Sequence, residues 1–203
     1  WSKIRHPNIL QFLGANVWDD RPFIVMPYLA YGNARSYIQA HPQCNRIKIL
    51  HGVSLGLVHL HSQEIVHGDL KALNVLIDDS HKAVLCDFGL SRAKADATSR
   101  TVHTAPALIV GSRNWMAPER ILGGSLNKQC DIYAFGMTLF EVFTDEIPLG
   151  HIDYGDFYEL VIQRDLRPER PEDAKIKRRG LSDAMWDLAQ RCWKKSANER
   201  PTA

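Results

Sequence analysis

The sequence has few cysteines, and no two of them are spaced as a metal-binding or redox pair would be. Its four cysteines are far apart and form no C-x-x-C motif, at Cys44, Cys86, Cys130 and Cys192. Neither a zinc site nor a disulfide framework is therefore indicated. We expect the protein to work in a reducing environment, in the cytoplasm or the nucleus, and take the cytoplasm as the prediction.

Long apolar runs and a strong net charge are also absent. No stretch approaches the roughly 18 to 20 uninterrupted apolar residues that a membrane helix needs, and Trp1 does not open a signal peptide. The net charge is only +2. The basic run Lys175–Arg179 is expected to be a solvated loop rather than a nucleic-acid patch. We therefore expect a soluble globular protein with no membrane and no nucleic-acid partner.

The most informative stretch contains two short strands. Val75–Ile77 and Ala83–Cys86 are apolar and β-branched enough to be buried strands, and turn-forming residues lie between them. The two strands are therefore expected to form an antiparallel hairpin. If Ile77 faces Val84, the residues that flank the open end of the hairpin come to lie side by side.

Those flanking residues are Asn74 and Asp87, and they have the chemistry of a magnesium site. An amide oxygen and a carboxylate are hard ligands, and Mg²⁺ commonly takes one or two protein carboxylates together with substrate phosphates. Asp69 and Lys71 precede the pair by a few residues and add a proton acceptor and a cation. This combination indicates phosphoryl transfer.

The same residues carry a resemblance to the protein kinase family. His67–Asn74, with the sequence HGDLKALN, resembles the family's catalytic loop H-R-D-L-K-x-x-N, and Asp87–Gly89 matches its metal motif D-F-G. Gly68 is the one departure among the positions compared. Gly111–Glu119, with the sequence GSRNWMAPE, resembles the G-T-x-x-W-M-A-P-E end of the activation segment.

The resemblance implies roles for four side chains and identifies the cofactors. Asp69 would accept the proton of the substrate hydroxyl, and Lys71 would balance charge on the moving phosphoryl group. Asn74 and Asp87 would hold Mg²⁺. ATP and Mg²⁺ are the implied cofactors, and a protein with a Ser or Thr hydroxyl is the implied substrate.

The implied fold is α+β, a protein-kinase-like two-lobe fold that is mainly the α-helical C-terminal lobe. Residues 1–203 would be a partial kinase domain, with 1–28 as the remnant of the small lobe and hinge strand and 29–203 as the large lobe. The glycine-rich phosphate loop, the strand lysine and its glutamate partner do not occur in the sequence. We therefore expect a kinase domain without the N-terminal part of its small lobe.

The adenine site is expected near the start of the chain. Apolar residues indicate strands over Leu10–Val17 and over Phe23 to about Tyr28. By the resemblance, Met26 is the gatekeeper, and it can be a core methionine at the same time. The implied nucleotide-binding residues, including the hinge, are Met26, Pro27, Tyr28, Leu29, Gly32 and Leu76.

Helical spacing of apolar residues and capping residues account for most of the remaining chain. The predicted helices run from the cap Asn33 to Gln39, from Asn45 to about Ser62, over Gln129–Thr144, over Tyr154–Gln163, and from the cap Ser182 to Cys192. The polar segment Ser91–Thr104 is expected to be a mobile loop.

Two long-range contacts are implied by the resemblance. Asp131 lies in the most apolar helix, and a buried carboxylate needs partners. The resemblance gives it the backbone amides of the catalytic loop. It also pairs Arg200 with Glu119 in a buried ion pair.

Three functions remain open at this stage. The intact set of Asp69, Lys71, Asn74 and Asp87 favours an active kinase of the tyrosine-kinase-like branch with Ser/Thr specificity, acting in signal transduction. A pseudokinase or scaffold that binds proteins without phosphotransfer is the alternative, supported by Gly68 and the missing N-terminal elements. A small-molecule phosphotransferase shares the loop but would not need Ala117–Glu119.

Overall fold

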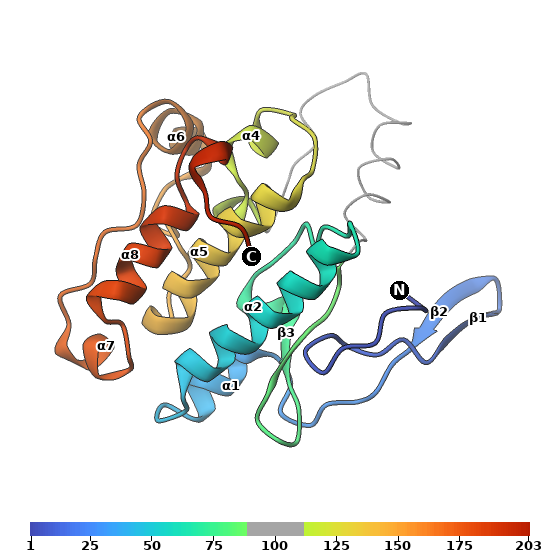
Figure 1. Cartoon of the computed structure of the whole chain (residues 1–203). Helices are drawn as coiled ribbons and strands as arrows, with labels where there is room; N and C mark the ends of the chain where they lie inside the picture. The colour runs from blue at the N-terminus through green and yellow to red at the C-terminus, as the bar shows by residue number, and fades with distance from the viewer. Residues whose placement is uncertain (89–111) are drawn as a thin grey trace.

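The structure is a computed structural model, and it describes residues 1–88 and 112–203 (Figure 1). The predicted mobile loop Ser91–Thr104, Gly89 of the D-F-G motif and Gly111 lie outside the described residues. The described chain is mixed α and β, with few strands and mostly helices. No helix within these two ranges combines the length and the apolar character that crossing a bilayer requires.

The chain begins with an exposed hairpin that extends away from the helices (Figure 1). β1 (Gly14–Trp18) pairs antiparallel with β2 (Arg21–Val25). Asp19 and Asp20 both have positive φ, 51° and 56°, as a two-residue turn of the type that matches strand twist requires. Near this turn both strands extend past the predicted limits, to Trp18 and from Arg21. At the open end the pairing stops short of the predicted limits, Leu10 and Tyr28.

The second hairpin differs from prediction by one residue. β3 (Val75–Ile77) pairs with β4 (Ala83–Leu85) so that Ile77 faces Ala83 rather than Val84. The cause lies in the connecting loop, where the amide of Asp78 donates to the carbonyl of Lys82 at 3.0 Å. That bond shortens the loop and shifts the register.

Helices make up most of the molecule, and polar residues mark where several of them begin. The side chains of Asn33 and Ser182 each accept a hydrogen bond from a backbone amide in the first turn, as predicted, and Asn45 does the same at the start of α2. The helices are α1 (Ala34–Ala40), α2 (Arg46–Ser62), α4 (Pro118–Ile121), α5 (Lys128–Thr144), α6 (Tyr154–Phe157), α7 (Ala174–Arg178) and α8 (Asp183–Cys192). Tyr158–Gln163 continues α6 as a π-helix.

The basic run that was predicted to be a loop belongs to α7. Asp173 caps this helix through the amide of Lys175 at 2.7 Å, and Ile176 packs its side chain into the core. The basic side chains of α7 therefore extend from a short helix anchored by one apolar residue.

The core is built around α5, which lies between α2 and α8 (Figure 1). Every residue from Cys130 to Thr144 is buried. Gly136 allows α8 to approach, because a Cβ at that position would lie 2.8 Å from the Cβ of Cys192. Gly56 of α2 packs in the same way against Leu85 of β4. The two glycines thus allow close packing of α5 on α8 and of α2 on β4.

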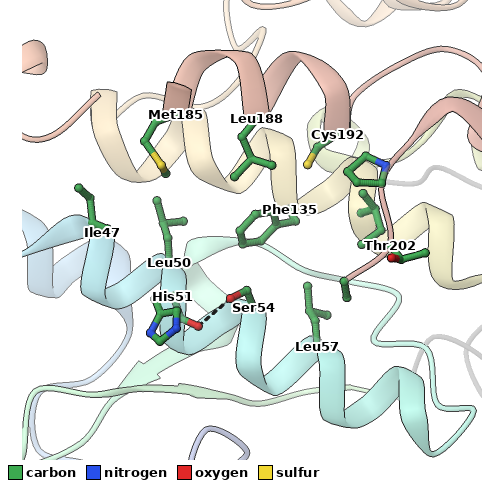
Figure 2. A pocket seen from close by; sticks show the side chains of 13 residues that line it. Ile47, Leu50, His51, Ser54, Leu57, Phe135, Met185, Leu188, Cys192 and Thr202 are labelled. Atoms are coloured by element: carbon green, nitrogen blue, oxygen red, sulfur yellow. Dashed lines mark hydrogen bonds between the residues drawn. The ribbon is translucent and has the colours of Figure 1, made fainter. Parts of the chain in front are cut away.

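An apolar cavity lies among these helices. It has a volume of about 310 Å³ and lies between α2, α5, α8 and the last residues of the chain, with Leu50, Leu57 and Phe135 in its wall (Figure 2). Met185, Leu188 and Cys192 of α8 face it from the other side. The cavity lies outside the hydrogen-bond network of the catalytic loop, described next.

Candidate active site

Asp131 of α5 holds the start of the catalytic loop, His67–Asn74. Its carboxylate accepts the amides of His67 and Gly68, each at 2.8 Å, and lies 2.8 Å from Nε2 of His61. The predicted contact between Asp131 and the loop backbone is confirmed. Asp131 is 1% exposed, so these bonds offset the cost of burying its charge.

Gly68 has a backbone conformation that residues with a side chain rarely adopt. Its φ is +81°, a conformation that costs other residues roughly 1–2 kcal/mol. Glycine therefore lets the loop turn there without strain while its amide reaches Asp131. The departure from the family's arginine also removes a cation from this position.

The loop brings three of the four predicted chemical groups together. Nζ of Lys71 lies 3.3 and 3.2 Å from the two carboxylate oxygens of Asp69. Asn74 donates its side-chain nitrogen to the carbonyl of Asp69 at 2.7 Å and to its carboxylate at 3.1 Å. The side chain of Asp69 remains 26% exposed, which leaves it accessible from solvent.

Lys71 also links the loop to Ser112, the first described residue of Ser112–Glu119. By the resemblance, residues from Asp87 to Glu119 would dock a protein substrate, so we call Ser112–Glu119 the docking segment. Its Nζ donates to Oγ of Ser112 at 2.6 Å. A single ammonium group therefore contacts both the carboxylate of Asp69 and a hydroxyl of the docking segment.

Asp87 lies next to this group along the hairpin, although not directly opposite Asn74 as predicted. The one-residue shift places Cys86 opposite Asn74, and the amide of Cys86 donates to the carbonyl of Asn74 at 3.0 Å. Asp87 follows in a left-handed conformation, with φ of 57°, and is exposed. Phe88 turns inward and packs edge-on against Trp1, with ring centroids 4.9 Å apart.

The donors present fit Mg²⁺. Both hydrogen bonds of Asn74 use its nitrogen, which leaves its oxygen able to face a cation, and the exposed Asp87 offers a carboxylate. Within the described ranges, no three His, Cys, Asp or Glu side chains gather to hold a metal ion by themselves. A two-ligand site matches a cation that keeps waters and phosphate oxygens in its shell. The metal assignment stays a prediction.

The predicted nucleotide-binding residues fall into two groups. Leu29 and Leu76 pack against the small apolar cluster of Leu10, Val84 and Cys86. Gly32 joins them, because its carbonyl accepts the amide of Ile77 at 2.9 Å and its amide donates to Leu29.

The other three predicted nucleotide-binding residues are not part of that cluster. Tyr28 is 90% exposed and Met26 is 36% exposed, and Pro27 is half-buried between them. Met26 is therefore not a core methionine in this chain. The adenine assignment stays a prediction for these residues.

The ion pair between Glu119 and Arg200 is confirmed. Two nitrogens of Arg200 lie 2.6 and 2.8 Å from the carboxylate oxygens of Glu119. Burial alone would raise the pKa of Glu119, but the hydrogen bonds and charge of Arg200 lower it below its usual value. The pair thus ties the end of the docking segment to the last residues of the chain.

Two buried charged residues were missed at the sequence level. Glu141 is 1% exposed in α5, and its Oε2 accepts the amide of Ala72 and Nε1 of Trp115, both at 2.9 Å. Arg46 is fully buried at the start of α2 and donates to the carbonyl of Val142. A charged residue within an apolar helical pattern was the available signal for Glu141.

Comparisons with known proteins agree with this geometry. The family model described as protein tyrosine and serine/threonine kinase matches residues 1–203, which is the whole chain. The catalytic loop and the docking segment both lie inside that match.

Relatives of this chain include all three kinase specificities. It is 29% identical over 203 residues to serine/threonine-protein kinase STY17 of Arabidopsis thaliana, covering 98% of this chain and 33% of that protein. It is 31% identical over 210 residues to the tyrosine-protein kinase transforming protein Abl of Abelson murine leukemia virus, covering 99% and 26%. It is 31% identical over 208 residues to the dual specificity protein kinase shkA of Dictyostelium discoideum, covering 99% and 38%. The chain therefore spans well under half of each of these relatives.

Proposed function

The chain belongs to the protein tyrosine and serine/threonine kinase family, and from that premise we propose that it transfers the γ-phosphoryl group of ATP to Ser or Thr hydroxyls of proteins. The contact that carries this proposal is Lys71, whose Nζ bridges the carboxylate of Asp69 and the hydroxyl of Ser112. The proposed base and the docking segment therefore both contact one cationic atom, Nζ of Lys71.

The proposed mechanism depends on positioning and on charge. Asp69, which is exposed enough to meet a hydroxyl, accepts its proton, while Lys71 faces the negative charge that moves with the phosphoryl group. Asn74 orients Asp69 through its two hydrogen bonds. Mg²⁺ held by Asn74 and Asp87 would neutralise phosphate charge when nucleotide is bound.

Ser/Thr specificity rests on the pair of Lys71 and Ser112. The lysine two residues after the base and the hydroxyl in the docking segment resemble Ser/Thr kinases, and STY17 is named as one. The proposal also takes 1–28 as the remnant of a small lobe, 29–203 as the large lobe, and the cytoplasm as the site of action in signal transduction.

The decisive experiment replaces the proposed base in the full-length protein. Asp69→Asn is nearly isosteric and should abolish phosphate incorporation into a protein substrate while leaving the thermal midpoint near wild type. Asp79→Asn is the matched control, because Asp79 is an exposed aspartate in the loop between β3 and β4. Near wild-type transfer by Asp69→Asn would show that another group accepts the proton.

Nucleotide binding tests the metal ligands separately. Asp87→Ala should weaken Mg²⁺-dependent ATP binding strongly, and Asn74→Ala should weaken it less, because only Asp87 carries a full negative charge. Titration of nucleotide with and without Mg²⁺ measures both effects. Equal losses from the two substitutions would contradict these roles.

Gly68 favours a second candidate, a pseudokinase or scaffold that binds proteins without transferring phosphate. The glycine removes a cation from a loop in which the other positions compared match the family. Nucleotide binding that is indifferent to Mg²⁺, together with no phosphate transfer by the full-length protein, would favour this candidate.

A further inference from the structure

Arg113 is a cation of the docking segment that the mechanism above does not use. It directly follows Ser112, whose hydroxyl accepts from Lys71 beside the proposed base Asp69. Arg113 therefore lies one residue from the contact that joins the docking segment to the catalytic loop. A charge at this position is close enough to act on a protein substrate whose hydroxyl has reached Asp69.

The guanidinium group of Arg113 is held in one orientation by α6 and the residues just before it. Its central carbon lies 4.8 Å from the ring centroids of both Tyr154 and Phe157, within the range of cation–π contacts. Nη2 donates to the carbonyl of Ile152 at 3.0 Å. The group is thus ordered before any ligand arrives, which lowers the entropy cost of binding one.

The charge of Arg113 has no carboxylate partner among the described residues. Other arginines with mostly buried side chains do pair with a carboxylate, as at Arg46, Arg167 and Arg200. Nη1 of Arg113 is shielded from water and has no acceptor within residues 1–88 and 112–203. A shielded N–H without an acceptor is unfavourable and calls for an explanation. An acceptor that a ligand brings would supply the missing bond.

The surface around Arg113 is suited to a protein ligand. The ring of Tyr154 covers one side of the guanidinium and is nevertheless 60% exposed. Tyr158, which begins the π-helix after α6, is 49% exposed. Tyrosine and arginine are enriched among the residues that dominate protein–protein binding. Because the ring of Tyr154 is exposed, it can turn aside and uncover the guanidinium.

A carboxylate is the acceptor that fits this cation. A neutral acceptor would satisfy the N–H group and leave the charge unpaired, whereas Asp or Glu would do both through a charge-assisted hydrogen bond. A protein substrate carries such groups on side chains near its hydroxyl. Since an extended peptide advances about 3.3 Å per residue, the group should lie within about three residues of that hydroxyl.

We propose that Arg113 is a specificity-determining residue, which selects protein substrates that carry an Asp or Glu close to the phosphorylated hydroxyl. This inference rests on the proposed function and names the substrate class of that site. Tyr154 and Phe157 hold the cation in place, and the carboxylate of the substrate forms the ion pair that the described part of the chain does not provide.

The first test varies the substrate and leaves the protein intact. The full-length protein is given serine peptides in which each position close to the serine is in turn Glu, Gln or Lys. At one position Glu should raise kcat/KM about tenfold over Gln, mainly through a lower KM, as expected for one charge-assisted hydrogen bond. Lys at that position should be worse than Gln. No charge preference at any position would overturn the proposal.

Substitutions of Arg113 separate specificity from stability. Arg113→Met keeps an unbranched stem and removes the charge, so Glu and Gln peptides should be phosphorylated equally well. Arg113→Glu should instead prefer the Lys peptide at the same position. If Arg113→Met lost activity equally towards all peptides and kept the preference for Glu, the arginine would only support the fold, and the proposal would be wrong.

Two further variants control for folding and for the loss of any arginine. Arg113→Lys keeps the charge without the planar fork, so it should fold and show a reduced preference for Glu. A preference as large as that of wild type would mean that another residue recognises the carboxylate. Arg191→Met removes an exposed arginine of α8 that pairs with Asp187 and should leave the peptide preference unchanged. Thermal midpoints are measured for each variant.

Peptide binding separates failure of this proposal from failure of the proposed function. Fluorescent Glu and Gln peptides of the same series are titrated with full-length Asp69→Asn, which lacks the base and keeps Arg113. At least one Glu peptide should bind about tenfold more tightly than its Gln counterpart, and adding Arg113→Met should remove the difference. If the wild-type protein transfers no phosphate, the proposed function fails, and this titration still decides the recognition. Equal binding of all Glu and Gln pairs would overturn it.

Discussion

The two ends of α5 are both charged, yet they organise different parts of the molecule. At the N-terminal end the helix supplies a side-chain acceptor, Asp131, and the catalytic loop supplies the backbone donors. At the C-terminal end the helix supplies backbone carbonyls, and Arg46 and Arg179 donate to them from α2 and from the residue after α7.

A single carboxylate completes the C-terminal arrangement. Asp145 ends α5 in a left-handed conformation, with φ of 67°, and pairs with both Arg46 and Arg179. Cations at a helix C-terminus are favoured by the helix dipole. The comparison teaches that Asp131 holds the start of the catalytic loop, whereas the last carbonyls of α5 and Asp145 hold the helix against Arg46 and Arg179.

The largest effect is expected at the N-terminal end. Asp131→Leu leaves the amides of His67 and Gly68 without acceptors and should cost about 3–5 kcal/mol of unfolding free energy, with loss of phosphate transfer. Chemical denaturation and activity measure both effects. Asp131→Asn should cost less because it keeps one oxygen. Asp187→Asn, at an exposed site of α8, should be nearly neutral.

The C-terminal end should lose stability without losing function. Arg46→Met removes a buried cation but leaves Asp145 paired with Arg179, so we expect about 2 kcal/mol from the same denaturation measurement. The kcat of the folded protein should not change. The control Arg164→Met breaks an exposed pair with Glu159 and should shift stability by under about 0.5 kcal/mol. A fall in kcat for Arg46→Met would erase the distinction between the two ends.

A smaller effect is expected from strain in the loop at the N-terminal end. Gly68→Ala must adopt a φ of +81°, at a cost of about 1 kcal/mol. Gly155→Ala in α6 meets open space and should be neutral or stabilising. Thermal midpoints of the two variants check this, and equal shifts would show that the positive φ of Gly68 is not a constraint.

The smallest effect is a change in how stability depends on pH. The folded pKa of Glu119 is lowered because Arg200 outweighs the opposing effect of burial. The unfolded chain therefore binds more protons between that value and about 4.3, and stability falls as pH falls through this window. Denaturation from about pH 7 to about pH 3 should show a shallower acid loss for Glu119→Gln than for wild type. An identical slope would mean that the pair with Arg200 does not lower the pKa.

Local signals in the sequence predicted the helices well. Asn33, Asn45 and Ser182 each cap a helix through an amide only a few residues away, so their pattern is visible in a short window. Motif resemblance supplied the distant contacts of Asp131 and of Arg200 with Glu119. A family pattern can encode such contacts because both partners lie in recognisable motifs.

The features that the sequence did not predict depend on partners that are distant in the sequence, or on a single hydrogen bond in a loop. The amide of Ala72 that donates to Glu141 is 69 residues away, and the carbonyl of Val142 that accepts from Arg46 is 96 residues away, so no local pattern marks either contact. The register of β3 and β4 depends on the bond between Asp78 and Lys82. The helix α7 was not predicted because the basic run was interpreted from its charge alone. The cap Asp173 and the buried Ile176 were not taken into account.

The position of Arg46 in the chain has a consequence for the lifetime of the native state. Its bonds join α2 to residues 96 and 99 positions further along, so they close very long loops. Such contacts stabilise the chain only after most of its conformational entropy has been lost. We therefore expect them to form after the folding transition state, where they slow unfolding and leave the folding rate unchanged. Arg46 then governs how long a folded molecule persists rather than how quickly it is made.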